Sequence, residues 1–368
     1  MDDLTLRCFL PKTSRRPIVA VMAIVLFTAN WAAADATDPI ESPRLFAAPS
    51  PPQVATQTAD EVLLISTRPL GTSCDAQQMV QKLYCERFIR NPGGKSSWKS
   101  VAWQELVSEA QDRRPTVVYV HGNRIDRGED RSRGLKIYRS LSGVLRQEGP
   151  IRYVIWSWPA TQIPGPVKDY YVKAGRTRQI SWQLAWFLRQ TPEQTPVSVI
   201  GYSMGARVVS GAMHLLGGGR LGGLKIEPDE RPHRPQIRVA LVAAAVDADW
   251  IQPGGYHGRA LSAIEKLYVV TNRRDPAMRY FYLSHDRGRI RALGWAGVDQ
   301  PGSLGSAAKR VRLLDLTKVI GRNHGLTDYL AAGPHLSRIW RQLIPHDTRL
   351  AENDATHRSE PKREERRQ

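Results

Sequence analysis

The sequence predicts an α/β fold in which helices cover both faces of a mostly parallel sheet. Several short runs are apolar at every position and rich in β-branched residues, which is typical of strands buried on both faces. Stretches with the apolar spacing of helices alternate with these runs. Polar residues suited to catalysis follow directly after several strands, at the edge where open α/β sheets place their sites.

The first half of the chain is expected to supply four strands and three helices. The strands are recognised by apolar runs that end at Pro, Gly or polar residues: residues 61–67, 98–101, 116–120 and 153–158. The helices are recognised by apolar residues at helical spacing: residues 103–110, 135–145 and 168–189. Met79, Val80, Leu83 and Tyr84 also have near-helical spacing, so the segment between Cys74 and Cys85 could contain a helix.

The second half is expected to complete the sheet. Its strands are residues 197–200, 237–246, 267–271 and 311–316, each followed by a polar loop or turn. A helix begins near Ala206, and a final helix covers about residues 336–343. Residues 217–235 are rich in Gly and Pro without periodicity, which indicates a surface insertion.

The stretch at residues 196–210 predicts a nucleophile. A short apolar strand leads into G-Y-S-M-G at residues 201–205, and a helical pattern follows at once. Strand, G-x-S-x-G and helix together form a nucleophile elbow, which lifts the serine hydroxyl above the sheet edge. Ser203 is therefore the candidate nucleophile, and the alternative is a surface serine in an ordinary glycine-rich turn.

Ser203 needs a base, and the base needs an acid to orient it. On a sheet with this elbow the chain order is Ser, then Asp or Glu, then His. His324 follows the last predicted strand and is the preferred base, with His335 as the second choice. Asp275 is the preferred acid because it follows the strand at residues 267–271, and it could also cap a helix that begins at Pro276.

Two further carboxylates remain as alternative acids. Asp247 and Asp249 follow the preceding strand and could also reach the base. The oxyanion hole is expected to use the backbone N–H groups of Met204 and Asn123. His121 precedes Asn123 and is expected to be structural. No motif for a metal, a phosphate or a dinucleotide is present, so no cofactor and no metal are expected.

The N-terminal residues suggest an exported protein. Residues 1–36 have a basic segment, an apolar core and small residues suited to cleavage, which predicts a signal peptide, or a membrane anchor if it is not cleaved. Residues 37–60 read as a flexible linker, 61–345 as the folded domain and 346–368 as a charged, disordered tail. We expect a periplasmic or extracellular location, in which Cys74 and Cys85 could form a disulfide.

The formal net charge of +18 has two interpretations. It could mark a nucleic-acid or anionic-surface partner, but no nucleic-acid-binding motif accompanies it. A generally cationic surface is therefore preferred. We expect no nucleic-acid partner, leave association with the cell envelope or a membrane surface open, and identify no protein partner.

These motifs together resemble the α/β-hydrolase superfamily, and more narrowly a bacterial family described as α/β hydrolases of unknown function or serine esterases. The matching segments are I-S-T-R near Ile65, V-V-Y-V-H-G-N ending at Asn123, W-S-W-P at residues 156–159, G-Y-S-M-G at 201–205, V-D-A-D at 246–249, R-R-D-P-A around Asp275 and N-H at His324. The resemblance implies Ser203 as nucleophile, Asp275 as acid and His324 as base.

The function expected from this resemblance is an exported serine hydrolase, most simply a carboxylesterase or lipase-like enzyme that acts on a small ester or acyl substrate through an acyl-enzyme. A serine peptidase or acyltransferase would use the same three residues. A non-catalytic binding protein at the cell envelope is the alternative from another class.

Overall fold

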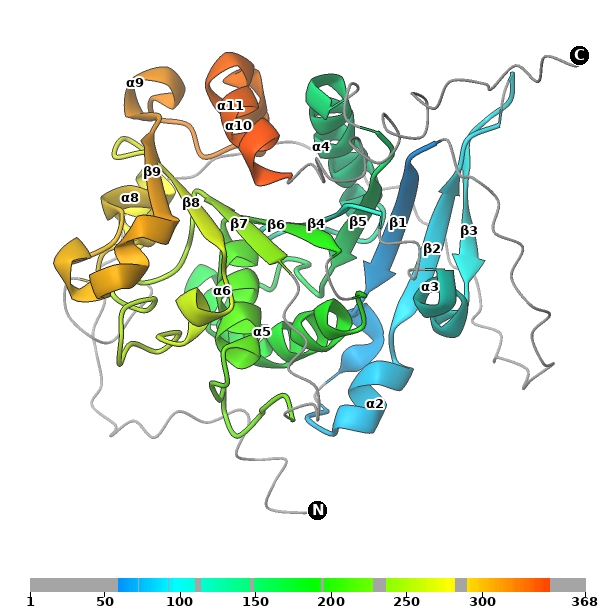
Figure 1. The fold of residues 1–368 in the computed structure, drawn as a ribbon, viewed down its shortest axis with the longest axis horizontal. Coiled ribbons are helices and arrows are strands. Elements are labelled where there is room, and N and C mark those ends of the chain that lie inside the picture. Colours follow the sequence, from blue (N-terminus) through cyan, green and yellow to red (C-terminus); the bar gives the residue numbers. More distant parts are fainter. Residues whose placement is uncertain are drawn as a thin grey trace, which may run out of the picture. The chain divides into compact units, whose positions relative to one another are not determined.

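The computed structural model describes residues 59–71, 73–91, 93–109, 114–145, 149–192, 195–227, 236–281 and 290–344. Within these residues the strands form one nine-stranded sheet in the order β3-β2-β1-β5-β4-β6-β7-β8-β9 (Figure 1). The strands are β1 Glu61–Ser66, β2 Tyr84–Ile89, β3 Ser97–Val101, β4 Thr116–Val120, β5 Arg152–Ser157, β6 Pro196–Tyr202, β7 Gln236–Val242, β8 Lys266–Thr271 and β9 Val311–Asp315. The strand β2 pairs antiparallel with both β1 and β3, and every other adjacent pair is parallel.

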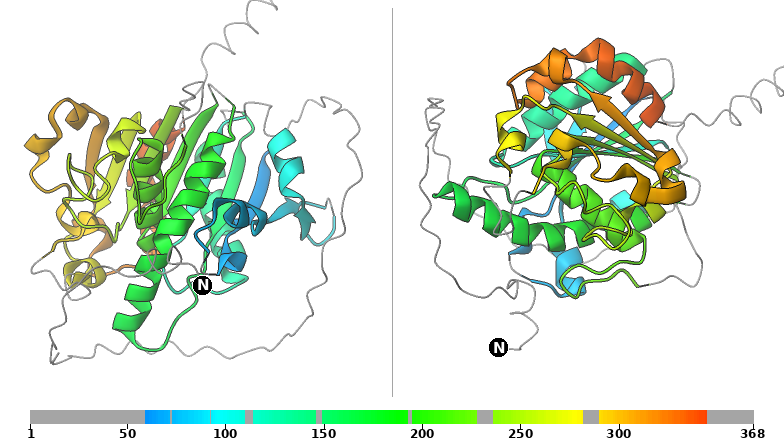
Figure 2. Two further views of the ribbon diagram at one scale, coloured as in Figure 1. Left: turned by 90° about the horizontal axis from the view of Figure 1, so that it is seen from below. Right: turned by 90° about the vertical axis from the view of Figure 1, so that its left-hand side faces the viewer.

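Helices cover both faces of this sheet (Figure 2). One layer contains α4 (Glu129–Leu145), α10 (Leu326–Ala331) and α11 (Gly333–Leu343). The opposite layer contains α2 (Ala76–Gln81), α3 (Trp103–Glu109), α5 (Pro166–Arg189) and α6 (Met204–Leu216). Short helices α7 (Pro276–Arg279), α8 (Leu293–Ala296) and α9 (Thr317–Ile320) lie around the strands β8 and β9.

The alternation of side chains along each central strand explains why two helical layers form. In β4, Val118 and Val120 belong to the apolar core beneath α5 and α6. Val117 and Tyr119 point the other way and belong to the core beneath α4 and α11. Because successive side chains alternate between faces, a strand that is apolar at every position needs a cover on both sides. The predicted α/β class, with its mostly parallel sheet and helices on both faces, is confirmed.

The segment after Cys74 corrects one prediction. The helix α2 ends at Gln81, and the chain then enters strand β2, which pairs with β1. In this pairing Cys85 lies opposite Ile65 and is only 2% exposed. It is a free thiol, and burial raises its pKa to about 12. The predicted disulfide between Cys74 and Cys85 is therefore wrong, because β2 turns Cys85 into the core, while the Sγ of Cys74 lies 3.5 Å from the side-chain amide of Gln179 on α5.

The predicted signal peptide at residues 1–36, nearly all of the predicted linker at 37–60 and the predicted tail at 346–368 lie outside the described residues. Among the helices given above, none combines the length and the apolar character that a membrane span requires.

Candidate active site

Ser203 lies in the tight turn between β6 and α6. Its backbone has φ 52° and ψ −120°, a left-handed conformation that is unfavourable for a residue with a side chain. Two hydrogen bonds, one to the last residue of β7 and one to the segment that follows it, hold it there. The Ser203 N–H donates to the carbonyl oxygen of Val242 at 3.0 Å, and the Ala245 N–H donates to the Ser203 carbonyl at 3.2 Å. The neighbouring strand therefore fixes the turn that presents the hydroxyl.

The two glycines of the elbow allow a close approach of backbone segments. A Cβ on Gly205 would lie 2.3 Å from the carbonyl oxygen of Val120 and 2.5 Å from that of His121. A Cβ on Gly201 would lie 2.7 Å from the Cα of Ala206. Both positions exclude a side chain, so the first turn of α6 can pack directly against the end of β4.

Ser203, His324 and Asp275 form a continuous chain of hydrogen bonds. The Nε2 of His324 lies 3.1 Å from the Oγ of Ser203, and its Nδ1 lies 2.6 Å from the Oδ2 of Asp275. The Asp275 side chain is fully buried, whereas the His324 side chain is 29% exposed. A carboxylate on Nδ1 favours the tautomer with its proton there, which leaves Nε2 free to accept the hydroxyl proton of Ser203.

Asp275 also caps α7, as its position before Pro276 suggested. Its second oxygen, Oδ1, accepts hydrogen bonds from the backbone N–H groups of Ala277 at 2.9 Å and Met278 at 3.3 Å. These bonds fix the side-chain rotamer, so Oδ2 remains directed at His324. The cap and the contact with His324 therefore use different oxygens of one carboxylate.

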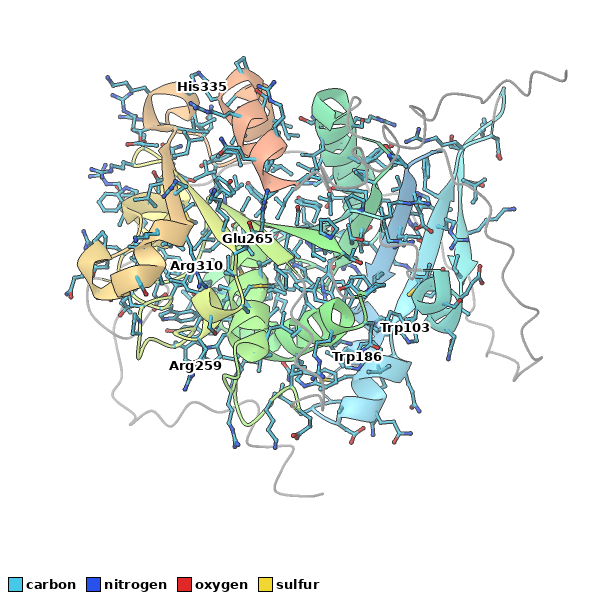
Figure 3. All side chains as sticks on the ribbon, viewed as in Figure 1. Trp103, Trp186, Arg259, Glu265, Arg310 and His335 are labelled. Carbon is cyan, nitrogen blue, oxygen red and sulfur yellow. The ribbon has the colours of Figure 1, made fainter. Side chains whose placement is uncertain are left out.

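The alternative acids, Asp247 and Asp249, and the alternative base, His335, lie outside this chain of hydrogen bonds among the described residues. Asp247 is buried after β7 and forms an isolated backbone bridge with Ala292, and Asp249 is exposed. Neither makes a hydrogen bond to His324 among the described residues. His335 is exposed on α11, and Figure 3 shows it in the helical layer that includes α10 and α11.

The loop after β4 runs beside the nucleophile. A Cβ on Gly122 would lie 3.1 Å from the Cβ of Ser203, so the next residue, Asn123, is close to the elbow. His121 is fully buried and stacks on Trp158. Its Nε2 accepts the backbone N–H of Trp158 at 3.1 Å, and burial lowers the pKa of His121 to about 4. His121 is therefore a neutral, structural histidine, as the sequence suggested.

A buried ion pair anchors the same loop to α5, which sequence analysis missed. Asp169 and Lys173 are 1% and 0% exposed, and Lys173 Nζ lies 2.5 Å from Asp169 Oδ1. The other carboxylate oxygen accepts a hydrogen bond from the side-chain amide of Asn123 at 2.9 Å. Lys173 also donates to the carbonyl of Ala160 at 2.9 Å. The Asn123 side chain is thus held by Asp169 on α5.

A second polar network, also missed, joins the ends of β1 and β5. Arg68 donates from Nε to Ser157 at 2.9 Å and from a terminal nitrogen to the carbonyl of Ile125 at 2.9 Å. Ser157 donates a short hydrogen bond to Asp130. Burial alone would raise the pKa of Asp130, but this bond and the charge of Arg68 hold it below its usual value. The signal was in the sequence: Arg68 and Ser157 belong to the I-S-T-R and W-S-W-P segments.

The described part of the chain contains no group of three or more His, Cys, Asp or Glu side chains placed to bind a metal ion.

Comparison with known proteins revealed similar structures only. No family model matches the chain, and no curated protein matches its sequence. Carboxyl esterase 2 from the fungus Tuber melanosporum is 13% identical, with 76% of this chain and 91% of that one covered at a TM-score of 0.34. Esterase B from Lactobacillus rhamnosis is 12% identical, with 83% and 93% covered at 0.34. A lipase-esterase related protein from Clostridium acetobutylicum is 13% identical, with 62% and 94% covered at 0.28. At these TM-scores the similarities assign neither an activity nor a substrate.

We expect Gly205→Ala to destabilise the protein strongly. The new methyl group would overlap two backbone carbonyls, which cannot move without shifting β4, so the loss should be at least about 2 kcal/mol. Gly143→Ala is the control, because its Cβ on α4 meets nothing within 4 Å, and it should stabilise the helix by about 0.5–1 kcal/mol. Urea unfolding measures both variants. Equal stability of the two would contradict the close packing of α6 on β4.

The buried Asp169–Lys173 pair predicts that Asp169→Asn loses folding stability in a pH-dependent way. Burial alone would raise the pKa of Asp169, but the hydrogen bonds from Lys173, Ile163 and Asn123 hold it below its ordinary value. A carboxyl group whose pKa is lower in the folded chain stabilises the fold at pH values above its pKa in the unfolded chain, which is about 4. This contribution disappears as the pH falls through the pKa of the folded state.

Asp169→Asn should therefore cost about 3–5 kcal/mol at neutral pH, because it leaves the Lys173 ammonium buried without a counter-charge. Urea unfolding at several pH values should show the gap to wild type narrowing below about pH 4. Glu129→Gln is the control, since its i,i+4 pair with Arg133 is exposed and should change stability by less than about 0.5 kcal/mol. A constant gap across this pH range would contradict the prediction.

Proposed function

We propose that this protein is a serine hydrolase that cleaves carboxylic esters through an acyl-enzyme on Ser203. The observation that carries the proposal is the unbroken hydrogen-bond chain from Asp275 through His324 to Ser203, at the tip of a strained strand–helix turn. Three residues from three loops, separated by up to 121 positions, meet in the order and geometry that nucleophilic acyl transfer requires. Export across a membrane is part of the proposal and is supported by the N-terminal sequence alone.

In the proposed reaction the Oγ of Ser203 attacks the carbonyl carbon of the ester while Nε2 of His324 takes its proton. Asp275 keeps Nδ1 protonated and stabilises the imidazolium that forms. The carbonyl oxygen becomes negative, and the backbone N–H groups of Met204 and Asn123 would bind it. When the tetrahedral intermediate collapses, the imidazolium gives its proton to the departing alcohol. Water then attacks the acyl-enzyme by the same route and releases the acid.

Covalent labelling tests the nucleophile. The full-length protein should react with a fluorophosphonate probe, and mass spectrometry should find the phosphonyl group on Ser203. Ser203→Ala should abolish labelling. Ser210→Ala is the matched control, because Ser210 also lies 2.8 Å from a histidine nitrogen, that of His257, but is buried within α6. Labelling that survives in Ser203→Ala would refute Ser203 as the nucleophile, whereas a wild-type protein that does not label would favour a binding function.

Asparagine substitutions identify the acid. Asp275→Asn should lower kcat by about 10⁴-fold, as the same change does in other serine hydrolases, because the amide favours the wrong tautomer of His324. Asparagine still caps a helix well, so α7 should remain intact. Asp247→Asn should leave kcat nearly unchanged. Turnover of 4-nitrophenyl esters measures both variants, and the reverse pattern would move the acid to the end of β7.

A further inference from the structure

Tyr202 connects the candidate nucleophile to the candidate base. It is the last residue of β6 and directly precedes Ser203. Its hydroxyl donates a short hydrogen bond to the backbone carbonyl of His324, 122 positions further along the chain. Its ring also stacks on the imidazole of His324, with the ring centroids 5.6 Å apart and the planes 30° apart. One side chain therefore contacts both the main chain and the ring of His324.

The Tyr202 ring also packs against residues other than His324. A Cβ on Gly122 would lie 3.0 Å from the Cδ1 of Tyr202, so the loop after β4 packs directly on the ring. Tyr329 on α10 meets the ring edge-on, with centroids 6.5 Å apart. Tyr202 is 7% exposed. A side chain packed this closely has little freedom to change rotamer, so its hydroxyl defines a fixed point in space.

The loop that carries His324 is held at two places by side chains. Asn272, which directly follows β8, donates from its side-chain amide to the carbonyls of Gly321 at 2.9 Å and Asn323 at 3.3 Å. The next carbonyl, that of His324 itself, is the one that accepts from Tyr202. Asn272 therefore ties the loop to the strand that leads to Asp275, and Tyr202 ties it to the strand that leads to Ser203.

We propose that Tyr202 is a positioning residue that holds His324 in register with Ser203. The proposal rests on the function proposed above. Because Tyr202 and Ser203 are adjacent in the chain, any bond from Tyr202 to the His324 backbone fixes the base relative to the nucleophile itself. Without the hydroxyl, the His324 main chain loses this restraint, and the 3.1 Å contact between Nε2 and Oγ lengthens in part of the population.

An isosteric substitution isolates this role. Tyr202→Phe removes the hydrogen bond and keeps the ring that stacks on His324. We expect kcat for a 4-nitrophenyl ester to fall between about fivefold, the value of one lost hydrogen bond, and about a hundredfold, the cost of a misplaced catalytic group. KM should stay within about twofold, because Tyr202 is not proposed to contact the substrate. Tyr202→Leu, which also removes the ring contact, should lower kcat further.

Tyr268→Phe is the matched control. Tyr268 lies on β8 in the same apolar core, and its hydroxyl donates to the backbone carbonyl of Gln342, 74 positions away. The variant Tyr268→Phe therefore loses the same kind of hydrogen bond, but one that has no connection to His324. Its kcat should equal that of wild type. If Tyr202→Phe and Tyr268→Phe lose the same factor, the role of Tyr202 is only structural and the proposal is overturned.

An NMR measurement, which needs no turnover, distinguishes a failure of the proposed hydrolase function from a failure of the proposed role of Tyr202. The Nδ1 proton of His324, bonded to Asp275, should give a downfield NMR signal that broadens in Tyr202→Phe but not in Tyr268→Phe. A wild-type protein that shows this signal but neither labels nor cleaves esters would refute the hydrolase function alone. An active wild type with equal signals in both variants would refute the role of Tyr202 alone.

Discussion

The backbone of Ser203 is the constraint on which the site depends. A serine at φ 52° carries a strain of about 1–3 kcal/mol, and such a conformation persists only where the surroundings determine it. Here they do so from two sides. The last residue of β7 bonds the N–H of Ser203, and the segment after β7 bonds its carbonyl. The end of β4 packs against Gly205 without room for a methyl group. The elbow can therefore form only when β4, β6 and β7 are already adjacent, which links the site to the whole sheet.

Polar networks occupy the carboxyl edge of the sheet, whereas the layers above and below are apolar. The Asp169–Lys173 pair holds the loop at Asn123, and Arg68 with Asp130 and Ser157 holds the neighbouring end of β5. Buried ion pairs of this kind contribute little net stability compared with apolar packing, but breaking one is costly. Their contribution here is geometric, because a loop tied at several fixed points keeps its backbone N–H groups in one orientation.

The sequence predicted the central strands, the elbow and the meeting of Ser203 with residues after the last two strands, because each depends on local patterns that the sheet then brings together. It failed for β2. This strand carries Glu86 and Arg87, whose charges are paired with Arg131 and Glu61, so its composition does not resemble that of a buried strand. The same error produced the disulfide prediction, since a pairing of cysteines cannot be judged until the strand that turns Cys85 inward is known.

The choice among Asp247, Asp249 and Asp275 depended on information that no single segment contains. Each follows a strand at the same edge of the sheet, so local pattern alone leaves them equivalent. The position of the loop that carries His324 distinguishes the three carboxylates. Asn272, directly after β8, and Tyr202 determine that position through their hydrogen bonds to the loop. Tyr202 occupies a variable position of G-x-S-x-G, for which the motif itself states no role. A residue type that the motif leaves open thus contacts both the candidate base and the loop at Gly122, and only the folded chain shows why an aromatic hydroxyl is useful there.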